Sequence, residues 1–176
     1  MFFSVTINGR EVHNVENTNP KTFTNVRVFA GDKSKPAADA SYRNLLWENF
    51  HVDHSFNIGT KIQRNKEIGT IDSWGPFFRV SFDLIIHSLD NNIQWSSVIS
   101  FFYDTGTGKI LPLPAILLHS SGFLELYNDF FGNTYGSRRF PFKIGHNHWY
   151  NIIIEQKSVR GKVIGFHKIS LEHLPS

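Results

Sequence analysis

The chain has 176 residues, of which 17 are Phe and 4 are Trp, and its formal net charge is +3. This length suits one sizeable hydrophobic core and is short for two sandwich domains, and the 15% aromatic share favours the half-buried surfaces of an all-β fold. The Lys and Arg residues are scattered, whereas nucleic-acid binding needs a concentrated basic face, so no nucleic-acid partner is expected.

Cysteine is absent, which excludes disulfide bonds, thiolate zinc sites and cysteine nucleophiles together. No run approaches the roughly 20 apolar residues that a membrane span requires, so membrane insertion is not expected. The segment "MFFSVTINGR" has neither the basic region nor the long apolar stretch of a signal peptide, so none is expected in this chain.

The first third of the chain has the pattern of a β-meander. The stretch "FFSVTING" alternates Phe3, Val5 and Ile7 on one face and ends in Asn8-Gly9, the strongest short hairpin signal, because both residues tolerate positive φ. A second strand follows, and residues 22–30 ("TFTNVRVFA") continue the alternation as a third.

Less regular segments follow this meander. Residues 31–40 ("GDKSKPAADA") form a loop by their Gly, Asp, Lys and Pro content. Residues 41–50 suit a helical turn or a strand, and both alternatives stay open. Residues 51–59 ("HVDHSFNIG") have few apolar side chains and indicate a linker or surface crossover.

The second block is richer in strands. Residues 74–88 ("WGPFFRVSFDLIIHS") and 93–104 ("IQWSSVISFFYD") each form one, residues 113–129 form two joined at "SSG", and residues 149–174 supply the last two. About ten strands with short loops are typical of a two-sheet antiparallel sandwich. The side chains expected in or at the edge of its core include Trp74, Phe82, Trp149 and Ile153.

The strand motifs of this block are "W-x-P-x-F-x-V-x-F-x-L", "x-P-A-I" and "W-x-x-I-x-I-x-Q". In this order they resemble the first two-thirds of a laminin G-like, concanavalin A-like jelly-roll domain. Residues 1–50, with "F-x-V-x-I-N-G", "F-x-N-V-x-V-x-A-G-D" and "P-A-A-D-A-x-Y-R-N-L", are similar to the remaining third. The resemblance implies one β-sandwich domain over residues 1–176, in which 1–50 correspond to the C-terminal part and 55–157 to the N-terminal part.

The swapped order has two explanations. The domain is circularly permuted, or the chain joins the tail of one repeat of a tandem array to the head of the next. A jelly roll tolerates permutation because its termini usually lie close together. In a permuted domain "FFSVTING" pairs beside a strand such as "NIIIEQ"; in a cut array it completes a neighbouring chain, which makes a homo-oligomer. The tail "VIGFHKISLEHLPS" departs from the family order.

Enzymatic motifs are missing. The "E-x-D-x-x-E" strand that carries the carboxylates of β-glucan-cleaving jelly rolls does not occur, and Glu125 is interpreted as a solvent-facing strand residue. His146 and His148 share a face of an extended segment, but two ligands do not make a metal site. The "SSG" segment lacks the context of a hydrolase nucleophile, and "DTGTGK" lacks the spacing and following helix of a phosphate-binding loop. No enzymatic activity is expected.

A binding face is the remaining hypothesis. Laminin G-like domains often hold calcium at the sandwich rim, and the resemblance implies Ca²⁺ as a candidate cofactor, with Asp104 and Asp129 as its ligands. The alternative is turn chemistry, since Asp and Asn bond their own backbone in turns. The aromatic side chains of the same loops form a candidate surface on which a sugar ring could stack. The alternative for Phe130 and Phe131 is that they lie in the core. The candidate ligand-binding residues are Tyr103, Asp104, Tyr127, Asn128, Asp129, Asn133 and Tyr135.

The sequence therefore predicts a non-enzymatic, lectin-like recognition module that binds a glycan or glycoprotein. The resemblance implies an extracellular location. The alternative is a structural or adhesive protein–protein module that assembles through strand exchange or edge pairing.

Overall fold

The fold is that of a computed structural model, which describes residues 1–32, 34–49, 53–56, 60–107, 110–128 and 136–157. Within these residues the chain forms two antiparallel sheets and no helix, so the prediction of an all-β, two-sheet sandwich is confirmed. Across the same residues there is no helix with the length and apolar character that a membrane crossing needs.

The first sheet, sheet A, has the strand order β2-β1-β13-β8-β4-β5, and β6 also pairs with β4. Its strands are β1 (Phe2–Ile7), β2 (Arg10–Glu16), β4 (Ala40–Glu48), β5 (Asp53–Phe56), β6 (Thr60–Lys61), β8 (Phe78–Ile86) and β13 (Trp149–Lys157). Sheet B has the order β12-β11-β10-β9-β3-β7. Its strands are β3 (Phe23–Phe29), β7 (Glu67–Trp74), β9 (Trp95–Asp104), β10 (Ile110–His119), β11 (Phe123–Asn128) and β12 (Gly136–Lys143).

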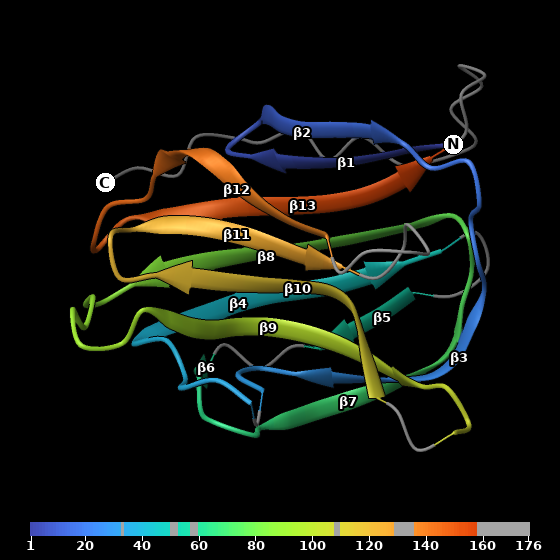
Figure 1. Ribbon diagram of the computed structural model, residues 1–176, viewed down its shortest axis with the longest axis horizontal. Helices are drawn as coiled ribbons and strands as arrows, with labels where there is room; N and C mark the ends of the chain where they lie inside the picture. Colours follow the sequence, from blue (N-terminus) through green and yellow to red (C-terminus); the bar gives the residue numbers. More distant parts are fainter. Residues whose placement is uncertain (33, 50–52, 57–59, 108–109, 129–135, 158–176) are drawn as a thin grey trace.

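Figure 1 shows the sheets as two layers, with β10 and β11 of sheet B overlying β8 and β4 of sheet A. One hydrophobic core lies between the layers. The strand predicted within residues 74–88 is confirmed as β8, in which every second side chain points into the core and is at most 1% exposed. These side chains are Phe78, Val80, Phe82, Leu84 and Ile86.

The N-terminal strand lies inside sheet A, between β2 and β13. It runs antiparallel to β13, with Phe3 opposite Gln156 and Val5 opposite Ile154, so the predicted pairing of "FFSVTING" with "NIIIEQ" is confirmed. Asn8 and Gly9 both have positive φ (49° and 76°), as the hairpin turn between β1 and β2 requires. The first strand thus contributes its apolar face to the core of its own chain.

Two residues expected at the core are placed elsewhere. The inward positions of β13 are Ile152 and Ile154, and the strand period of two therefore turns Trp149 and Ile153 outward. Trp149 is 40% exposed, and the guanidinium carbon of Arg43 lies 4.1 Å from its ring centre. The prediction of Trp149 as a core residue is wrong, and Ile153 is half-buried on the outer face.

Residues 41–48 belong to a strand, β4, rather than a helical turn. Residues 53–56 pair with this strand, although residues 51–59 were expected to form a linker or surface crossover. The strands β6, β7 and β12 were not predicted. β7 has a weak apolar alternation ("EIGTIDSW"), and β12 contains two Arg residues and a Pro, so neither has the strong period of β8.

Candidate functional site

The outer face of sheet B, away from the core, contains a groove of about 680 Å³. Its lining side chains come from β3, β9, β10, β11, β12 and two loops, and they lie as far apart in sequence as Arg27 and Ser137. The lining residues are Arg27, Phe29, Ser34, Lys35, Asn65, Trp95, Phe102, Ile110, Pro112, Ala115, Leu117, Glu125, Tyr127 and Ser137.

Strand β10, in the interior of sheet B, has apolar side chains on both of its faces. The pairing of β10 with β9 shifts register between Pro112 and Ala115 and again between Ile116 and Leu117. These irregularities turn Ile116 into the core, whereas Ala115 and Leu117 line the groove. Ala115 and Leu117 are nevertheless at most 9% exposed, so they form a closely packed apolar floor.

Aromatic side chains extend this floor. Phe29 of β3 packs edge to face on Phe102 of β9, with ring centres 5.6 Å apart. Trp95 is half-buried at the start of β9, and its ring packs edge to face with that of His119, with ring centres 4.5 Å apart. Tyr127 of β11 is also half-buried. The groove therefore presents partly exposed aromatic rings to solvent.

One wall of the groove is the loop that follows β3. Gly31 has a φ of +89°, and a Cβ at this position would lie 2.5 Å from the carbonyl oxygen of Gln63, so the loop needs glycine here. Asp32 is buried, and its Oδ1 accepts hydrogen bonds from the backbone N–H groups of Ser34 (2.7 Å) and Lys35 (3.0 Å). Its Oδ2 accepts a bond from Ser100 Oγ (3.3 Å). These bonds hold Ser34 and Lys35 at the edge of the groove.

Two ion pairs flank the groove. Arg27 Nε donates a hydrogen bond to Glu67 Oε2 at 3.0 Å, and this bond raises the pKa of the guanidinium above its usual value. Glu125 lies 3.8 Å from Arg139 Nε, and the guanidinium carbon of Arg139 lies 5.3 Å from the ring centre of Trp95. Glu125 points away from the core, as interpreted, and lines the groove, but neighbouring side chains leave only 13% of its side chain exposed.

The predicted ligand-binding residues only partly coincide with this groove. Tyr127 lines it. Tyr103 instead packs against the core, with its ring centre 4.5 Å from that of Phe23. Asp104 is exposed at the end of β9, and its Oδ1 accepts a bond from Gly106 N (2.8 Å), which is the turn chemistry of the alternative interpretation. Asn128 is the last residue of β11.

The other predicted site residues lie outside the described residues: Asp129, Phe130, Phe131, Asn133 and Tyr135. The expected pairing of Asp104 with Asp129 around calcium is therefore still a prediction. Among the described residues no group of three or more His, Cys, Asp and Glu side chains has the arrangement of a metal site. His146 and His148 are both exposed, directly before β13.

A smaller cavity of about 270 Å³ lies near the hairpin turn between β10 and β11 and is lined partly by Asp39 and His119. A hydrogen bond from Ser88 and a second from Lys61 lower the pKa of Asp39. His119 Nδ1 accepts the backbone N–H of Ser121 at 3.1 Å and lies 2.5 Å from its Oγ, so the "SSG" serine is bonded within its own turn, as expected.

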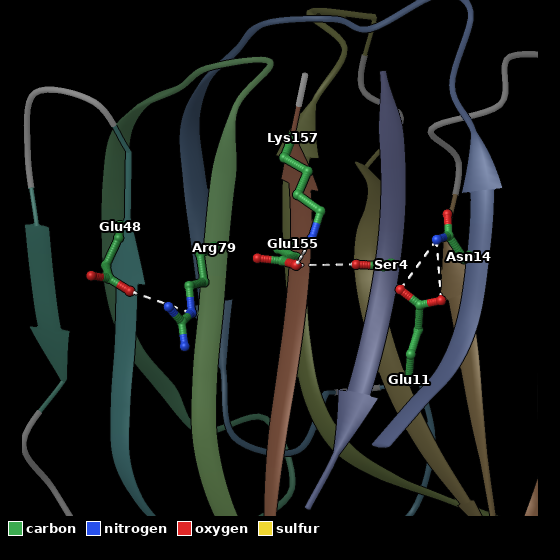
Figure 2. A network of polar contacts seen from close by, with 7 residues as sticks. All are labelled: Ser4, Glu11, Asn14, Glu48, Arg79, Glu155 and Lys157. Carbon is green, nitrogen blue, oxygen red and sulfur yellow. Dashed lines mark hydrogen bonds and ion pairs between the residues drawn. The ribbon is translucent and has the colours of Figure 1, made fainter. Parts of the chain in front are cut away.

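The outer face of sheet A has a different character. Figure 2 shows a row of polar side chains that runs across β4, β8, β13 and β1. Glu48 lies 3.8 Å from Arg79, and Glu155 accepts bonds from Lys157 (2.6 Å) and Ser4 (3.3 Å). In this row Arg79 and Lys157 each face a carboxylate of the same sheet.

Sequence reasoning missed most of the groove. The sequence signal for the groove was the run "ILPLPAILL" in β10. A strand with apolar side chains on both faces favours contacts on both, and so indicates a binding surface on the face opposite the core. Comparison of the chain with protein-family models, curated proteins and solved structures finds no match, so the groove is interpreted from its own geometry.

Proposed function

We propose that this protein is a non-enzymatic carbohydrate-binding module and that the glycan of an oligosaccharide or glycoprotein lies in the groove of sheet B. The observation that carries the proposal is an open groove with half-exposed aromatic rings, Trp95 and Tyr127, above an apolar floor. Its edge has hydrogen-bonding side chains, among them Ser34, Asn65 and Ser137.

This combination matches the chemistry of a sugar ring. The C–H groups on one face of a pyranose are apolar and stack on an aromatic ring, while the hydroxyl groups around the ring need donors and acceptors. Among the described residues that line the groove only one, Glu125, has a carboxylate, and it faces Arg139. Since glycoside hydrolysis ordinarily needs two carboxylates, binding without turnover is the better-supported activity.

The laminin G-like resemblance of the strand motifs and the extracellular location that it implies are part of the same proposal. The second candidate, an adhesive module that exchanges strands between chains, has less support. Strand exchange would need β1 to pair with another chain, whereas β1 is already flanked by β2 and β13 of the same chain.

A glycan array followed by titration of the best oligosaccharide tests the proposal. Trp95→Ala is expected to weaken binding by about 2 kcal/mol, or roughly 30-fold in Kd, because it removes the largest aromatic surface of the groove. Trp149→Ala is the matched control: it removes an exposed Trp from the outer face of sheet A and is expected to leave Kd unchanged. Equal losses in both variants, or no binding to any glycan, would contradict the proposal.

The calcium proposal has a separate test. If Asp104 and Asp129 share a metal, millimolar Ca²⁺ raises the melting temperature because the ion binds only the native state, and Asp104→Asn removes the increase. Differential scanning calorimetry with calcium and with chelator measures this. Identical melting curves leave Asp104 as the residue that forms the turn at Gly106.

A further inference from the structure

Lys35 is a cation of the groove lining that has no carboxylate partner among the residues that the structure describes. It lies at the edge of the groove and is half-buried. Its backbone N–H is bonded to Asp32, which fixes where the side chain begins, but among the described residues no carboxylate lies within ion-pair distance of its ammonium group.

The other charged side chains among the described residues of the groove lining have partners. Arg27, the other cation of the groove lining, is bonded to Glu67, and Glu125 faces Arg139. On the outer face of sheet A, Arg79 and Lys157 likewise face Glu48 and Glu155. Among the described residues that line the groove, Lys35 therefore carries the positive charge that no carboxylate offsets, and such a charge attracts an anion.

We infer that the groove selects an acidic oligosaccharide, whose carboxylate or sulfate group contacts the ammonium group of Lys35 while a sugar ring stacks on the aromatic side chains. This inference rests on the proposed function and narrows it to a ligand class. The three parts of the groove then have separate roles: the aromatic rings bind the sugar face, the polar edge binds hydroxyl groups, and Lys35 distinguishes acidic from neutral glycans.

The test compares matched ligands by isothermal titration calorimetry. One pair is a galacturonate hexamer and its methyl ester, and the other is a sulfated heparan-type hexasaccharide and its desulfated form. The wild-type protein is expected to bind the acidic member of at least one pair about tenfold more tightly than the neutral member. The pair that shows the preference identifies the anionic group.

Three variants locate the preference. Lys35→Gln is expected to bind the acidic and neutral members equally, and Lys35→Arg to keep the preference because it keeps the charge. Lys21→Gln removes the same charge from an exposed position outside the groove lining and is expected to behave as wild type.

Equal binding of acidic and neutral members by the wild-type protein would overturn the role of Lys35 and leave the carbohydrate-binding function standing. A preference that Lys21→Gln reduces as much as Lys35→Gln would also overturn it, because the effect would then come from net charge. Failure of every oligosaccharide to bind, here and on the array, would overturn both the inference and the proposed function.

Discussion

Deletion of residues 1–30 is expected to leave an insoluble protein. It removes β1 and β2 from sheet A and β3 from sheet B, so one cut opens both layers of the sandwich. The buried apolar side chains lost include Phe3, Val5, Ile7, Phe23, Val26 and Val28. At about 1.5–3 kcal/mol each, their burial contributes about 9–18 kcal/mol, which is as large as the 5–15 kcal/mol net stability of a typical domain.

The deletion also exposes new edges. β13 loses its neighbour β1, and β7 loses β3, its connection to the rest of sheet B. Unpaired strand edges promote aggregation. Sedimentation of the expressed fragment measures solubility, and coexpression with a peptide of residues 1–30 is expected to restore it. A soluble, cooperatively melting monomer without the peptide would show that β1 does not complete its own sheet and would favour exchange of strands between chains.

The sequence predicted the strands whose alternation is strong. β8 places five apolar residues at every second position, and β1 combines three such residues with an Asn-Gly turn, so local pattern alone is sufficient there. β5 and β6 are short and polar, and their pairing depends on β4 being beside them. Trp149 shows the converse limit: an aromatic residue at an outward position can be accommodated by an Arg from β4, which is separated from β13 by β8.

The candidate site was harder to predict because it forms across strands distant in sequence. Tyr127 was predicted as a ligand-binding residue and lines the groove, but the floor around it depends on the register shifts of β10, which no periodicity reveals. The wall of the groove depends on Asp32. In the sequence Asp32 is an ordinary loop residue, and only the fold brings Ser100 close enough to donate a hydrogen bond to it. Loop polarity indicated turns correctly at Asp104, whereas the sheet face that carries the groove had to be seen in three dimensions.

Asp32→Ala is expected to destabilise the protein by about 3 kcal/mol, which corresponds to a decrease of ~6–12 °C in Tm. The carboxylate accepts bonds from two backbone N–H groups, from Ser34 Oγ at 2.7 Å and from Ser100 Oγ at 3.3 Å. Truncation leaves these donors without their acceptor at a position that is 4% exposed. Asp32→Asn keeps one acceptor oxygen, so a smaller loss of about 1–2 kcal/mol is expected.

The matched control is Asp90→Ala. Asp90 also accepts a backbone N–H two residues along the chain, from Asn92 at 2.8 Å, but it is exposed, so water replaces the lost acceptor at a cost below about 1 kcal/mol. Hydrogen exchange adds a local measurement, since the Ser34 and Lys35 amides are expected to lose protection in Asp32→Ala and to keep it in Asp90→Ala. Equal stability of the two variants, with both amides still protected, would show that the groove wall is held by contacts other than the Asp32 carboxylate.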